Sequence, residues 1–212
     1  FGGGNLGTAI SEAALHSLQA MKAGRPRPYD ALVAEVSSFQ LETVEQFHPW
    51  IAAILNVTVD HQDRYESIDE YIAAKNRIFE NQTPSDYALF NLDDSRVAPL
   101  RRSARARVLG FTRTQTLPPD LDGGTYLDRD RLMTTIGGQT QEICARSEIK
   151  IIGDHNIENA MVAATYALLS GCPLSVVRQV LREFPGLEHA LEVRRGCNGF
   201  LTYCKCQQKL GS

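Results

Sequence analysis

Short apolar runs alternate with segments of helical periodicity along most of the chain. The apolar runs are too short for helices and lie at 31–36, 50–57, 87–90 and 106–111. The run at 50–57 is nearly free of polar residues, as in a strand buried on both faces. Segments with apolar residues at helical spacing lie at 8–21, 68–82, 156–169 and 174–184. This alternation predicts an α/β fold with a mainly parallel sheet flanked by helices on both faces.

Two details refine this prediction. Ser67 precedes the helix predicted at 68–82 and is followed by Glu70, which predicts a capping box, and Pro84 ends the segment. Between residues 124 and 146 the pattern changes to alternation, with Gly137–Gly138 as a turn, which predicts a small β-hairpin excursion.

Composition narrows the class of protein. The 212 residues suffice for one large or two small domains, and a hydrophobic fraction of 43% is ordinary for a globular protein. A net charge of -3 argues against a nucleic-acid partner. No apolar run has membrane-spanning length, and the five cysteines have an odd count and loose spacing. We therefore expect a cytoplasmic protein without membrane insertion or a disulfide framework.

The first candidate for chemistry is Glu35, near the end of an apolar strand. Ligands of open α/β sheets bind at the carboxyl ends of strands, so a carboxylate there suits a metal or phosphate site. An ion pair with an arginine is the structural alternative for Glu35 alone. The polar stretch Ser37, Ser38 and Gln40 follows directly and favours a phosphate-lined site.

Two further candidates follow along the chain. His61 comes after the apolar run at 50–57, where a helix-capping or core histidine is the ordinary interpretation. Lys75 lies on the helix at 68–82, with Ile72, Ile78 and Phe79 at helical intervals around it. A solvated lysine is the usual case, but burial would favour a neutral, nucleophilic amine that can add carbon dioxide to give a carbamate.

The last motif is Gly153–Ala160, a loop that leads into a helix. Asn156 suits either helix capping or an anion and nucleotide site at the helix start. A Gly-x-Gly-x-x-Gly pattern at Gly2–Gly7, with Asp30 downstream, matches a dinucleotide fingerprint, but a lone match of this kind is weak.

Taken together, these separated motifs resemble the central, ATP-binding domain of the Mur ligases, from about Gly3 to about Glu192. The resemblance implies a P-loop-NTPase-like fold with Mg²⁺ as cofactor and ATP as a substrate. It implies that Glu35, His61 and Lys75, the last as a carbamate, form the catalytic magnesium site. It also implies that Asn156 and Asn159 bind ATP. Asn5, Ser37 and Gln40 are implied to bind the other substrate.

Within the family, the stretches Gly3–Gly7, Ser37–Glu42 and Asp60–Arg64 resemble members that add D-glutamate to UDP-N-acetylmuramoyl-L-alanine. The implied reaction is ATP-dependent amide-bond formation through an acyl phosphate, for peptidoglycan synthesis. The alternatives are another Mur ligase, a folylpolyglutamate synthase, or a nucleotide-binding module without ligase activity.

The chain also departs from the family pattern. The 212 residues contain no Gly-x-x-x-x-Gly-Lys-Ser/Thr phosphate loop, which the family places upstream of Gly3. Ala190 stands where the family has arginine, and Cys204–Lys209 does not match the family's next motif. We therefore expect residues 1–187 to be a central domain without its phosphate loop, and residues 188–212 the divergent or truncated start of a C-terminal domain. Such a fragment should be inactive alone, and the full-length enzyme should be a monomer.

Overall fold

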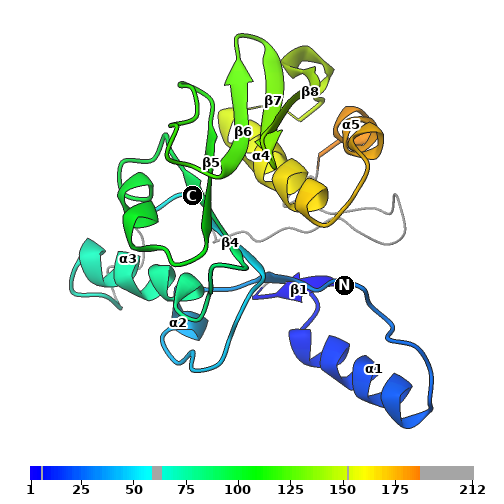
Figure 1. Ribbon diagram of the computed structural model, residues 1–212. Helices are drawn as coiled ribbons and strands as arrows, with labels where there is room; N and C mark the ends of the chain where they lie inside the picture. Colours follow the sequence, from blue (N-terminus) through cyan, green and yellow to red (C-terminus); the bar gives the residue numbers. More distant parts are fainter. Residues whose placement is uncertain (6, 59–63, 152, 187–212) are drawn as a thin grey trace.

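The computed structural model describes residues 1–5, 7–58, 64–151 and 153–186 (Figure 1). The strands are β1 Gly2–Gly4, β2 Val33–Glu35, β3 Ile51–Ile54, β4 Tyr87–Asn91, β5 Arg107–Thr112, β6 Gly123–Asp128, β7 Arg131–Ile136 and β8 Gln139–Ala145. The α-helices are α1 Ile10–Lys22, α2 Ser38–Leu41, α3 Ile68–Asn76, α4 Asp154–Leu169 and α5 Leu174–Glu183. Short 3₁₀ segments are η1 Arg77–Phe79, η2 Ala98–Ser103 and η3 Arg146–Glu148.

The strands form two sheets. β1 and β2 pair in parallel, and a six-stranded sheet has the order β3-β4-β5-β6-β7-β8. Pairing is parallel from β3 to β6 and antiparallel from β6 to β8. The prediction of an α/β fold with mainly parallel pairing is confirmed, although the strands are divided between two sheets.

The predicted hairpin excursion has three strands rather than two. Gly137 and Gly138 make the expected turn between β7 and β8, with φ values of 60° and 75°. A second tight turn joins β6 to β7, and there Arg129 takes the left-handed conformation with φ 55°. This turn was not predicted from the sequence, because residues 128–131 contain no glycine, the residue that usually marks such a turn.

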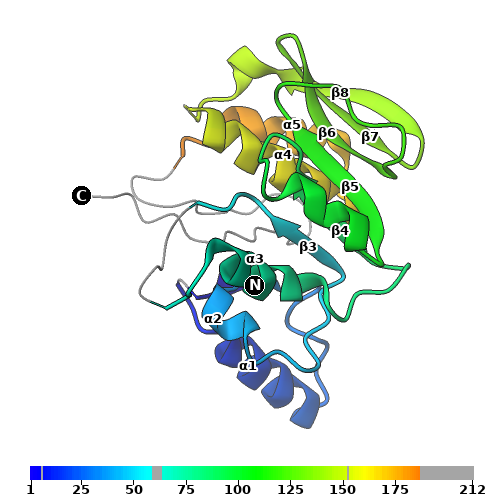
Figure 2. The same ribbon diagram turned by 90° about the vertical axis from the view of Figure 1, so that its left-hand side faces the viewer.

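Helices cover both faces of the six-stranded sheet. Phe90 of β4 pairs in register with Gly110, which pairs with Gly124, so these positions share one face of the sheet. The Phe90 ring packs on Phe79 of η1, with the ring centroids 4.8 Å apart. Thr125, next to Gly124, faces the other way. Its hydroxyl forms a hydrogen bond of 2.7 Å with a threonine of α4. Figure 2 shows α2 and α3 on one side of the strands and α4 with α5 on the other.

The core follows from this layering. Leu89, Phe90 and Phe111 are fully buried in the central strands, as the apolar runs predicted. By contrast, α1 projects from the β1–β2 pair (Figure 1), and its Leu15, Leu18 and Met21 are at least half exposed. No helix in the described part of the chain is long and apolar enough to span a bilayer.

The segment at 68–82 is helical in two parts, α3 and η1. The Ser67 hydroxyl accepts a hydrogen bond from the Glu70 N–H, as the capping prediction required. The Glu70 carboxylate receives the N–H of Glu66 rather than that of Ser67, so the reciprocal half of the box is displaced by one residue. This capped start places Lys75 in the last turn of α3.

Candidate functional site

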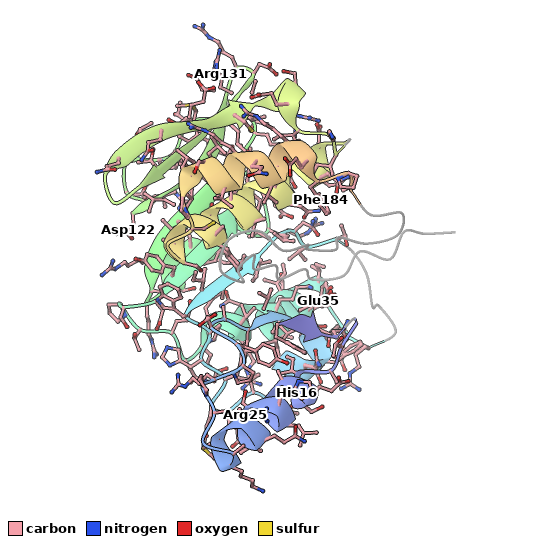
Figure 3. The ribbon with its side chains drawn as sticks, turned by 90° about the vertical axis from the view of Figure 1, so that its right-hand side faces the viewer. His16, Arg25, Glu35, Asp122, Arg131 and Phe184 are labelled. Atoms are coloured by element: carbon pink, nitrogen blue, oxygen red, sulfur yellow. The ribbon has the colours of Figure 1, made fainter. Side chains whose placement is uncertain are left out.

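Glu35 and Asn5 lie at the same end of the β1–β2 pair. Glu35 is the last residue of β2 and pairs in register with Gly4, and the Asn5 N–H donates to the Glu35 carbonyl over 2.8 Å. Gly4 has φ 135°, and a Cβ there would lie 2.0 Å from the Glu35 carbonyl oxygen. The glycine is therefore required for β1 to approach β2 so closely, and it brings Asn5 to the half-buried Glu35. Figure 3 labels Glu35 on this pair, between His16 of α1 and Phe184.

Ser37 and Gln40 bond to each other in a capping box at the start of α2. The Ser37 hydroxyl accepts the Gln40 N–H over 3.3 Å, and the Gln40 side-chain oxygen accepts the Ser37 N–H over 2.9 Å. The Ser-x-x-Gln spacing would have predicted this cap. A substrate-binding role for Ser37 and Gln40 stays a prediction. If they have that role, they have it in addition to capping α2.

Lys75 is buried, with 3% of its surface exposed. Its ammonium nitrogen lies 4.6 Å from the centroid of the Tyr71 ring, one turn earlier on α3. This burial shows that the alternative of a solvated helix lysine is wrong. Lys75 is buried because Ile72 and Phe79, on either side of Lys75 in the sequence, pack against or within the core.

His61 lies outside the described residues, but the chain on its C-terminal side is placed. Arg64 donates to one carboxylate oxygen of Glu42 over 2.6 Å, and the Tyr65 hydroxyl donates to the other over 2.7 Å. From the α3–η1 segment, Arg77 donates to the backbone carbonyl of Glu42 and, over 2.6 Å, to that of Val44. Glu42 thus connects the three motifs that the sequence analysis singled out separately.

Sequence reasoning missed these connecting residues, although each lies within or beside a quoted motif. Hydrogen bonds from Arg64, and then from Tyr65, lower the pKa of Glu42 despite partial desolvation. Burial raises the pKa of Tyr65 to about 12, so its hydroxyl remains a donor to Glu42. The Tyr65 ring also contacts Tyr71 at 5.2 Å, next to Lys75. The approach of Glu35, His61 and Lys75 to one another around a single crevice at the carboxyl ends of the strands stays a prediction.

Asn156 and Asn159 lie together at the start of α4. The Asn159 amide donates to the Asn156 side-chain oxygen over 3.4 Å, and Asn159 is buried. The N-cap residue is Gly153, without a side-chain cap, so the idea that Asn156 caps the helix is wrong. Asn156 belongs to the first turn instead, where backbone N–H groups favour anions.

No group of three or more His, Cys, Asp or Glu side chains that could hold a metal occurs among the described residues. Two members of the predicted magnesium site could not be counted in such a group. His61 is not described, and an unmodified lysine is not a metal ligand. The oxygen of Glu35 suits Mg²⁺, and the buried Lys75 amine would suit it only after conversion to a carbamate.

Comparison with known proteins identifies the family to which the chain belongs. A model of the Mur ligase middle domain matches residues 7–167. The UDP-N-acetylmuramoylalanine–D-glutamate ligase of Thermoanaerobacter pseudethanolicus is 39% identical over 174 residues, which cover 82% of this chain and 37% of the relative. The same-named enzyme of Pelobacter propionicus is 40% identical over 203 residues, covering 96% and 42%. The chain thus spans about two fifths of the length of these curated relatives.

Solved structures support the fold. A crystal structure of MurF from Acinetobacter baumannii matches with a TM-score of 0.56 at 17% identity, covering 93% of this chain and 48% of that one. Such a likeness concerns the fold alone, whereas the family model and the relatives concern ancestry. The chain belongs to the Mur ligase family, and the part that matches is the middle domain.

Proposed function

We propose that this domain works within an ATP-dependent ligase that joins D-glutamate to UDP-N-acetylmuramoyl-L-alanine in peptidoglycan synthesis. Two relatives of that name, 39% and 40% identical to the chain, support this choice of substrates. The observation within the molecule that carries the proposal is the buried Lys75, on a segment that Glu42 connects by hydrogen bonds to the two neighbouring motifs. Because the reaction consumes ATP, we place it in the cytoplasm.

The proposed reaction has two steps. A carboxylate oxygen of the sugar–alanine substrate attacks the γ-phosphorus of ATP, and the bond to ADP breaks. The amine nitrogen of D-glutamate then attacks the acyl carbon, the tetrahedral intermediate releases phosphate, and the nitrogen loses a proton. Negative charge accumulates in both steps, so catalysis depends on fixed positive charges and oriented donors.

In this scheme Glu35, His61 and the carbamate of Lys75 would hold magnesium, and the ion would supply positive charge to the transferring phosphoryl group. The carbamate forms when the neutral Lys75 nitrogen attacks the carbon of CO₂ and loses a proton. Burial of Lys75 supports this step, since an amine shielded from water is more readily neutral.

The remaining residues have positioning roles in the proposal. Asn156 and Asn159 hold the nucleotide at the start of α4, the end of a helix that favours anions. Asn5, Ser37 and Gln40 contact the sugar–alanine substrate. The Ser37 N–H and hydroxyl both donate to the Gln40 side-chain oxygen, which fixes the orientation of that amide.

An acceptor panel tests the proposal. The intact ligase is supplied with Mg-ATP and one acceptor at a time: D-glutamate with UDP-N-acetylmuramoyl-L-alanine, or L-alanine, a diamino acid or a dipeptide, each with its own nucleotide substrate. Phosphate release is measured. Release that requires D-glutamate supports the assignment. Release with another acceptor and its cognate nucleotide substrate indicates another Mur ligase, and nucleotide binding without release indicates a non-catalytic module.

A further inference from the structure

A polar network joins the carboxyl ends of β4 and β5 to the first turns of α4. Arg113, the residue after β5, donates from its Nε to Glu158 over 2.8 Å and pairs through a terminal nitrogen with Asp154 at 3.0 Å. Asp154 and Glu158 are one helical turn apart on α4, so the guanidinium spans that turn. Asn156 lies between them in the chain.

The two ion pairs differ in strength. The Arg113 and Glu158 side chains are 23% and 13% exposed, whereas the Asp154 side chain is 77% exposed. Water and salt screen the pair with Asp154, and the pair with Glu158 is therefore the main attachment.

Glu158 also reaches the neighbouring strands. Its second oxygen lies 3.4 Å from the amide nitrogen of Asn91, at the end of β4. The same Asn91 amide donates to the carbonyl of Leu55, just beyond β3, over 2.8 Å. One carboxylate on α4 is thus linked to the ends of three adjacent strands.

Asp93 accepts hydrogen bonds from the backbone of Arg113 and from the side chains of the residues beside it. The Arg113 backbone N–H and the hydroxyls of Thr112 and Thr114 all donate to the Asp93 carboxylate over 2.6 Å. Burial would raise the pKa of Asp93, but these hydrogen bonds outweigh it and lower that pKa. The backbone from which the guanidinium extends toward α4 is therefore bonded to a carboxylate whose charged form is favoured.

We infer that the Arg113–Glu158 pair is a positioning device that fixes the first turn of α4, and with it Asn156 and Asn159, at the carboxyl edge of the sheet. The N-cap residue Gly153, with φ 98°, gives the helix no side-chain cap of its own. The pair acts on the nucleotide only through the two asparagines. The inference therefore rests on the proposed function of Asn156 and Asn159 for its effect on ATP.

The first measurement is hydrogen exchange of the α4 amides in the 212-residue chain. Arg113→Met keeps much of the aliphatic stem and removes the charge and the donors. Loss of a charge-assisted, partly buried hydrogen bond should speed exchange at residues 157–160 by about tenfold or more, with the β4 and β5 amides unchanged. Arg113→Lys, which can bond one carboxylate only, should give an intermediate rate.

The second measurement is kinetic and uses the intact ligase. Arg113→Met should raise the KM for ATP by about tenfold, while kcat and the KM for D-glutamate change less than about twofold. Glu158→Gln should show the same split. The double variant should lose less than the sum of the two single losses, because neither partner is then left with an unpaired charge.

Arg131→Met is the matched control. Arg131 pairs with Glu142 on β7 and β8 in an exposed bridge of 2.5 Å, so its loss should leave both measurements unchanged. Unchanged α4 exchange in Arg113→Met and Glu158→Gln would overturn the positioning role. Faster exchange with an unchanged KM for ATP would instead refute the assignment of Asn156 and Asn159 to the nucleotide. If Arg113→Met does not fold, Arg113→Lys and Glu158→Gln decide the matter by the same two readouts.

Discussion

Replacement of Lys75 separates the proposed carbamate from an ordinary buried lysine. Lys75→Arg keeps a positive charge and a long stem, but a guanidinium does not add CO₂ under these conditions. Lys75→Ala removes the amine and leaves space at a site where only 3% of the lysine surface was exposed. Both changes remove a metal ligand if the carbamate forms.

The expected magnitude follows from the charge that the ligand helps to neutralise. Lewis-acid stabilisation of a transferring phosphoryl group is worth several kcal/mol, and ~3–5 kcal/mol corresponds to about a 10²–10⁴-fold loss in kcat/KM. A lysine with only a packing or cation–π role, worth ~0.5–2 kcal/mol, would lower activity far less when replaced by arginine.

The assay is steady-state ligation by the intact enzyme, with thermal melting as a control for folding. Added acetate or another short carboxylate should restore part of the Lys75→Ala activity, because it can occupy the vacated oxygen positions. Lys22, exposed at the end of α1, provides the matched control, and Lys22→Ala and Lys22→Arg should behave as wild type. A near-normal rate for Lys75→Arg would refute the carbamate.

Three other outcomes are expected. Glu42 has a lowered pKa, so its contribution to stability is present above pH 4.5, its unfolded value, and is lost as the pH falls through the folded value. Urea unfolding of Glu42→Gln between pH 6 and 3 should therefore show a weaker acid dependence than wild type, and an unchanged dependence would contradict this. Phe90→Ala, in the fully buried core, should reduce the free energy of unfolding by ~3–5 kcal/mol, measured by urea titration at neutral pH. A loss below ~1 kcal/mol would contradict the close packing of Phe90 in the core. The 212-residue chain, whose sequence has no phosphate loop, should bind Mg-ATP weakly by calorimetry, and micromolar affinity would disprove this.

The strands were predictable where burial alone decides the pattern. The runs that became β3, β4 and β5 are apolar because both of their faces are covered, and the glycine pair marked the turn between β7 and β8. The turn at Arg129 was missed because its left-handed residue is not a glycine. The division into two sheets could not be predicted, since it depends on which distant strands pair.

The candidate site shows the same limit. Motifs indicated which segments matter, and the apolar neighbours of Lys75 suggested its burial. The contacts that hold these segments join residues far apart in sequence: the residue numbers of Glu42 and Arg64 differ by 22, and those of Arg113 and Glu158 differ by 45. Such pairs leave no periodic signal, because each partner is an ordinary charged residue within its own segment.

Among the described residues, two effects act on the charge of Lys75 in opposite directions, and both bear on the chemistry. Burial disfavours the ammonium form, whereas the Tyr71 ring at 4.6 Å stabilises it. Carbamate formation requires the neutral amine, so the ring opposes the modification as long as no other group captures the product. A magnesium ion bound to the carbamate oxygens would supply that capture, because any ligand that binds one form of a group increases the population of that form. Modification and metal binding are then one linked equilibrium, and an assay of Lys75 variants must supply CO₂ and Mg²⁺ together.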